Sequence, residues 1–225
     1  MIARLRPRSD TTYLIHALAV MAGIFYCSWP LEYWINPTVA HRHGLASELG
    51  AAGQPYAWLF DATDIIACLL IFSTVFLLLR LYRFKGWLGA SLIGYASFGV
   101  LTIVDALLPL DCLPSSGTCG DVLRNPLIVA HGVTSITASL ALFVSAVCCW
   151  VVALKSDYRK IHAMMYAVLW GYMIFGLLSL LFIFVKGPGY LTQDYFIILT
   201  SVWIALLPFV LLQLKGPVTK KGLDL

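Results

Sequence analysis

Long apolar segments separated by short polar connections dominate the pattern of the chain. A helix needs about 20 mostly apolar residues to cross a bilayer. We expect six such spans at residues 12–30, 57–80, 87–110, 127–154, 161–185 and 194–214. The pattern therefore predicts an all-α fold, in which residues 1–225 form one bundle of six transmembrane helices.

The composition agrees with this pattern and narrows the class of protein. Hydrophobic residues make up 60 % of the 225 residues and charged residues 12 %, and the mean hydropathy is +0.87. The six spans leave no room for a soluble catalytic domain. The segment MIARLRPRSD resembles the start of a signal peptide, but Cys27–Pro30 is a poor cleavage site, so we expect a retained first helix.

Basic residues predict which way the bundle faces, because Lys and Arg near the ends of spans are retained in the cytoplasm. Of the 15 Lys and Arg residues, all but Arg42, Arg124 and Lys186 fall in the two tails or in the even-numbered connections. Both termini are therefore predicted to be cytoplasmic, in a plasma (inner) membrane. The net charge of +4 reflects this bias, and we expect no nucleic-acid partner.

Two outward connections have unusual sequences. The first, from Leu31 to Tyr56, is long for a connection between helices and is typical of a lid or binding element. It contains His41 and His43, a pair that favours solvent exposure over metal binding. The second faces an oxidising space, where Cys112 and Cys119 are predicted to form a disulfide.

Ionisable residues inside spans are costly and indicate a functional site unless they find a partner. Asp61 and Asp64 lie one turn apart near the outer end of the second span, and Asp105 lies near the outer end of the third. His131 opens the fourth span and shares a helix face with Ser135. Three more polar residues lie in the adjoining outer connections: Ser47, Glu48 and Asp111.

These residues together have the parts that metal-assisted hydrolysis requires. In this hypothesis Asp64, Asp105 and His131 bind a divalent metal or activate water, and Ser135 orients the scissile carbonyl. The metal is zinc or a harder ion such as calcium or magnesium. The substrate-binding candidates are Asp111, Glu48, Ser47 and Asp61.

Other interpretations of the same residues remain open. The acids can relay protons or bind a cation for transport, Asp61 and His131 can simply cap their helices, and the cluster can tie helices together without catalysis. His16 and His162 favour packing roles at opposite ends of their helices. We therefore expect no heme, and no nucleotide.

The chain resembles the bacterial six-span membrane family described as domain of unknown function 998. The resemblance covers roughly Ser47 to Ser139 and includes SELGAAGQPYAWLFDATDIIACLLIF, GVLTIVDALLPLDCLPSSGTC and HGVTS. It implies a six-helix bundle with an outward-facing polar site. A more distant similarity is to the alkaline ceramidases and adiponectin receptors, which are intramembrane hydrolases, although the paired histidines of their late helix have no counterpart here.

The first hypothesis is therefore an integral-membrane hydrolase that acts on the headgroup or acyl linkage of a membrane lipid, for example an aminoacylated phospholipid. The alternatives are a lipid or cation transporter that uses the same acids, and a non-catalytic membrane subunit. The sequence leaves an oligomer open.

Overall fold

The computed structural model describes residues 9–37, 44–116, 119, 124–156, 159–185 and 189–215, and this part of the chain is helical. His41 and His43 lie outside these ranges. The predicted all-α fold is confirmed.

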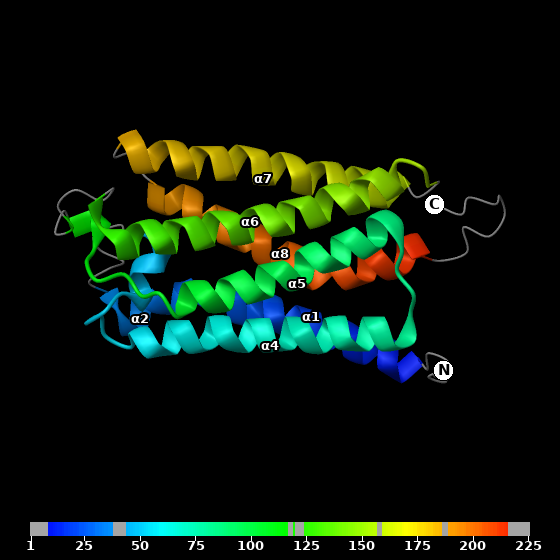
Figure 1. Cartoon of the computed structure of the whole chain (residues 1–225), viewed down its shortest axis with the longest axis horizontal. Helices are drawn as coiled ribbons and strands as arrows, with labels where there is room; N and C mark the ends of the chain where they lie inside the picture. The colour runs from blue at the N-terminus through cyan, green and yellow to red at the C-terminus, as the bar shows by residue number, and fades with distance from the viewer. Residues whose placement is uncertain are drawn as a thin grey trace.

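Six long helices form the bundle (Figure 1). They are α1 Ser9–Tyr26, α4 Ala57–Leu81, α5 Gly86–Ala106, α6 Pro126–Ala153, α7 Arg159–Val185 and α8 Gly189–Lys215. Short elements connect them: η1 Trp29–Leu31, α2 Glu32–Ile35, η2 Ala46–Gly50 and η3 Pro114–Ser116. Within the described ranges, five helices are long and apolar enough to cross a membrane. A 44° bend separates α1 from the segment formed by η1 and α2, and these together count as a sixth span if they are taken as one. The chain is thus a multi-pass membrane protein.

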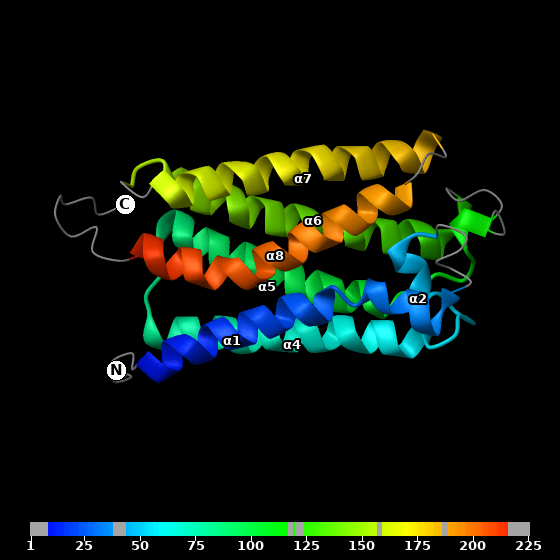
Figure 2. The same cartoon turned by 180° about the vertical axis from the view of Figure 1, so that it is seen from behind.

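The long helices form a ring in which each contacts the next, in the order α1, α4, α5, α6, α7, α8 and back to α1 (Figures 1 and 2). The start of α1 and the end of α8 lie at one end of the bundle. The other end, which we call the disulfide end, carries α2, η2 and η3. Which end faces the cytoplasm stays a prediction from the basic residues.

Two long helices end before the predicted ends of their spans, and a proline follows each of these helix ends. The third span was predicted to reach Leu110, but α5 ends at Ala106, shortly before Pro109. A residue that precedes proline is disfavoured in the helical conformation. The first span was predicted to reach Pro30, but α1 ends at Tyr26, and Pro30 belongs to the separate turn η1.

Glycines allow the closest helix contacts in the ring. A Cβ at Gly94 of α5 would lie 2.6 Å from the carbonyl oxygen of Ala141 in α6, and a Cβ at Gly23 of α1 would lie 2.5 Å from that of Ser201 in α8. Small residues let the backbones of membrane helices approach in this way. The α5–α6 contact is important for the site, because these two helices carry its central polar residues.

Candidate functional site: an acidic cavity at the disulfide end

A cavity of about 640 Å³ lies toward the disulfide end, and each of the six long helices contributes to its wall. Its polar part contains six residues that the sequence predicts for the site: Ser47, Asp61, Asp64, Asp105, His131 and Ser135. Its deeper part lies between α6, α7 and α8 and is mostly apolar. The cavity therefore joins charged and apolar walls in one space.

Asp105 is the centre of a hydrogen-bonded cluster between α5 and α6. Ser135 donates to its Oδ2 at 2.8 Å, and Thr134 donates to its Oδ1. His131 Nδ1 lies 3.4 Å from the same Oδ1, and the Asp105 side chain is 20 % exposed. Both carboxyl oxygens therefore already have protein partners, which fixes Asp105 beside the imidazole.

His131 has one nitrogen engaged and one unengaged. Its Nδ1 lies 3.1 Å from the carbonyl oxygen of Leu108. A carbonyl only accepts, so Nδ1 carries the hydrogen. Nε2 is buried in the part of the chain that the structure describes and has no hydrogen-bond partner there. In the neutral ring, Nε2 then has a free lone pair that can take a proton or bind a ligand.

Asp61 and Asp64 project from the first turns of α4 into the same cavity. Asp64 lies close enough to Asp61 and Asp105 for their charges to interact. Between described residues, no hydrogen bond reaches the Asp64 carboxyl group. The same holds for Asp61, so among the described residues Asp61 and Asp64 are the carboxyl groups of the cavity that are free to meet a bound molecule.

The segment η2 covers the polar part of the cavity. Gln193 Oε1 of α8 accepts a hydrogen bond from the Ala46 amide at 2.8 Å, and just after η2 the Ala52 amide donates to the Leu110 carbonyl at 2.7 Å. A Cβ at Gly50 would lie only 2.6 Å from Asp61 Oδ1, so glycine lets the cover approach the carboxyl group closely. The cover is thus attached at two places.

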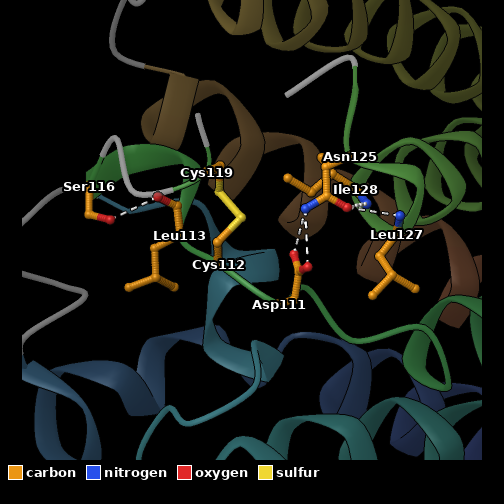
Figure 3. Close-up of a disulfide and its surroundings, with 8 residues drawn as sticks. All are labelled: Asp111, Cys112, Leu113, Ser116, Cys119, Asn125, Leu127 and Ile128. Carbon is orange, nitrogen blue, oxygen red and sulfur yellow. Dashed lines mark hydrogen bonds between the residues drawn. A yellow bond between two sulfur atoms is a disulfide. The ribbon is translucent and has the colours of Figure 1, made fainter. Parts of the chain in front are cut away.

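Two predicted substrate-binding residues of the outer connections do not line the cavity. Glu48 is fully buried, while its neighbour Ser47 does line the wall. Asp111 is exposed, and Asn125 Nδ2 donates to its two carboxyl oxygens at 2.9 and 3.1 Å (Figure 3). Because Asn125 also caps the first turn of α6, Asp111 anchors the start of that helix.

Cys112 and Cys119 form the predicted disulfide (Figure 3). It closes the loop that follows Asp111, next to the hydrogen bonds of Asn125. The remaining four cysteines are free. The bridge therefore stabilises the connection between the two helices that carry Asp105 and His131.

We expect a Cys112→Ser, Cys119→Ser variant to lose about 2–3 kcal/mol of stability, because the short closed loop restricts the unfolded chain. Thermal unfolding in detergent, with and without reductant, measures the effect. Reductant should lower the melting temperature of the wild type and of a Cys27→Ser control, but not that of the double variant. Equal melting of the double variant and the oxidised wild type would contradict the expectation.

The donors of the cavity do not form a complete metal site. Asp61, Asp64 and His131 Nε2 lack a hydrogen-bond partner among the described residues, and a catalytic zinc usually has three protein ligands held close together. No group of three or more His, Cys, Asp and Glu side chains in the described ranges is arranged to hold a metal ion. A divalent ion stays a prediction, and no step below depends on one.

Sequence reasoning gives no role to several residues that lie in the wall or directly behind it. Thr134 binds Asp105, Gln193 holds η2, and Tyr26 lines the cavity from α1. Gln193 had a visible signal, because it is a polar residue near the start of the last span. Tyr26 had none, because an aromatic residue near a span end equally favours the membrane interface.

Comparison with known proteins identifies the family of the chain. The family model described as "Protein of unknown function (DUF998)" matches residues 19–210. The chain belongs to the DUF998 family. The matched range includes every residue of this chain that lines the polar part of the cavity. No curated protein and no solved structure matches the chain. The more distant similarity to intramembrane hydrolases stays a prediction.

Proposed function

We propose that the chain is an integral-membrane hydrolase that cleaves a headgroup or acyl linkage of a membrane lipid. One observation carries the proposal: a single cavity joins a histidine and three aspartates to an apolar section between helices. A lipid has the same division into a polar head and apolar chains. The cavity is thus matched to such a molecule at both of its ends.

The unengaged Nε2 of His131 supplies the base. It takes a proton from a water molecule, and the water oxygen forms a bond to the carbonyl carbon of the lipid. The carbonyl carbon then releases the leaving oxygen or nitrogen, which takes the proton from Nε2. The products are a carboxylic acid and an alcohol or amine. Asp105, 3.4 Å from Nδ1, stabilises the positive ring between the two proton transfers.

Ser135 has a different role in this arrangement from the one that the sequence predicts. Its hydroxyl hydrogen is donated to Asp105. Orientation of a carbonyl by Ser135 therefore requires this hydrogen bond to change, and it stays a prediction. In the proposal, Ser135 and Thr134 hold Asp105 in place.

The charge of the wall favours a cationic headgroup. Asp61, Asp64 and Asp105 line the cavity, and no Lys or Arg is among the described residues of its wall. An ammonium group would reduce the repulsion among these carboxylates and would meet the free carboxyl group of Asp64. The ester of an aminoacylated phospholipid combines such a group with a scissile carbonyl, and we propose it as the substrate class.

Hydrolysis accounts for the cavity better than transport does. On α4, α5 and α8 the wall residues lie within the few turns nearest the disulfide end, and the deepest wall residues, on α6 and α7, stop well before the opposite end. A transporter needs a polar path that continues across the membrane. The lining described here gives no such continuation.

Turnover of defined lipids tests the proposal. The purified protein is incubated in vesicles with lysyl-phosphatidylglycerol, phosphatidylethanolamine, phosphatidylglycerol or ceramide, and the products are measured by mass spectrometry. We expect release of lysine from the first lipid and a lower rate with Asp64→Asn. Asp10→Asn, which changes an acid in the first turn of α1, is the control.

Turnover of none of these lipids, or equal rates for Asp64→Asn and Asp10→Asn, would contradict the substrate assignment. Elemental analysis of the same samples addresses the metal. A stoichiometric metal that is lost in an Asp105→Ala, His131→Ala double variant would place a metal in the cavity and replace the metal-free step.

A further inference from the structure

Four apolar residues belong both to the cavity wall and to the outer surface of the bundle. They are Ile136 and Leu140 of α6, with exposed fractions of 44 and 55 %, and Met173 and Leu177 of α7, with 45 and 63 %. Ile136 and Leu140 are one turn apart, as are Met173 and Leu177. These two pairs mark a seam between α6 and α7 at which the cavity reaches the lipid-facing side.

At this seam the two helices are near each other over a shorter length than elsewhere in the ring. In the described part of the chain, every other neighbouring pair of long helices approaches more extensively than α6 and α7 do. Gly176 lies in the wall of the cavity at this height, where a Cβ would be 3.5 Å from Phe196 of α8. A larger side chain at Gly176 would therefore extend toward Phe196 and into the cavity.

From its polar part to its deep part, the cavity extends over about the depth of one lipid monolayer. His131 is at its polar part, and Phe143, twelve residues further along α6, is at its deep part. Twelve residues of helix span about 18 Å. Half of the hydrocarbon core of a bilayer is about 15 Å thick. An extended acyl chain of one leaflet therefore fits between these two depths.

The segment η2 covers the cavity at the disulfide end, whereas the seam between α6 and α7 opens toward the side of the bundle. The segment η2 is attached to α8 through Gln193 and to the α5 connection through Leu110, and both attachments lie at the disulfide end. In a membrane, lipid chains surround the exposed face of Leu140 and Leu177. The molecules that meet the opening are thus the lipids themselves.

We infer that the seam between α6 and α7 is a lateral portal through which one acyl chain of a membrane lipid enters the cavity. The headgroup then lies beneath η2, near Asp64 and His131. The inference rests on the proposed function for the nature of the site, but it concerns binding and requires no turnover.

Photo-crosslinking tests the portal. The probe is a phosphatidylethanolamine that carries a diazirine near the end of one acyl chain, in vesicles of phosphatidylethanolamine and phosphatidylglycerol that contain the full chain. Crosslinked residues are identified by mass spectrometry. Tyr172 is the diagnostic residue, because it lines the deep cavity and is only 4 % exposed. We expect it to be crosslinked in the wild type.

Two variants that each introduce a phenylalanine distinguish blockage of the cavity from a general effect of the added ring on the bundle. Gly176→Phe fills the space beside Phe196 and is expected to abolish the crosslink to Tyr172. Val100→Phe, on α5, is the control, because Val100 is 53 % exposed on the outer surface and is not part of the wall. It should leave the crosslink unchanged. Leu177→Ala, which widens the seam, should increase it.

Two results would overturn the portal. One is a wild type crosslinked at exposed positions such as Leu69 and Phe76 but not at Tyr172. The other is a crosslink to Tyr172 that neither Gly176→Phe nor Leu177→Ala alters. His131→Ala should retain the crosslink, because the portal concerns binding alone. A wild type that is crosslinked at Tyr172 but hydrolyses none of the lipids supports the portal and contradicts the hydrolase. Lipid hydrolysis by a wild type that is not crosslinked at Tyr172 supports the hydrolase and contradicts the portal.

Discussion

A His131→Ala variant is expected to hydrolyse its lipid substrate at least about 100-fold more slowly than the wild type, because a positioned general base contributes about 10²–10⁴ to the rate. The substitution removes Nε2, which is buried at the cavity without a partner in the described part of the chain. Initial rates with lysyl-phosphatidylglycerol in vesicles measure the loss.

The control changes another histidine of the bundle. His162 lies near the start of α7, far along the helix from the wall residues Tyr172 to Ser179. We expect His162→Ala to retain turnover. His131→Ala also loses the hydrogen bond to Leu108, so its unfolding temperature is measured in parallel. A folded His131→Ala protein with the rate of the wild type would refute the role of this residue.

A Gly94→Val variant is expected to be less stable than the wild type. A Cβ at position 94 would lie 2.6 Å from the backbone oxygen of Ala141 and 3.1 Å from the Cβ of Ser145. Backbone cannot move aside as a flexible side chain can, so α5 and α6 must separate. Overpacking of this kind costs about 1–3 kcal/mol. Thermal unfolding in detergent should show a clearly lower midpoint.

The same variant should also impair the site. Separation of α5 from α6 moves Asp105 away from Thr134 and Ser135, which now hold its carboxyl group. The matched control is Gly132→Val on α6, where the added atoms meet open space. Equal melting of the two variants would show that the close approach at Gly94 is unimportant.

The polar part of the cavity was largely predictable from the sequence. A carboxyl group inside a hydrophobic span must find polar surroundings. Asp64, Asp105 and His131 all lie near helix ends that the alternating direction of the spans brings to one side of the membrane. Their convergence therefore follows from the order of the apolar segments, and the structure places all three on one cavity.

The apolar part was not predictable in the same way. A residue such as Leu177 has the same character whether it faces lipid or a cavity, so the hydrophobic pattern of a span does not distinguish the two. The connections were also difficult, because the direction of a side chain there depends on local backbone turns. Ser47 therefore reaches the cavity while the adjacent Glu48 does not.

The early end of α5 has a consequence for proton chemistry. Because α5 stops before Pro109, the Leu108 carbonyl lies beyond the helix and accepts from the imidazole of His131. A longer helix would direct this oxygen along its own axis. Pro109 thus helps to select the tautomer of His131, although it exchanges no proton itself. A substitution at position 109 would therefore alter the acid–base chemistry of the site as well as the length of α5.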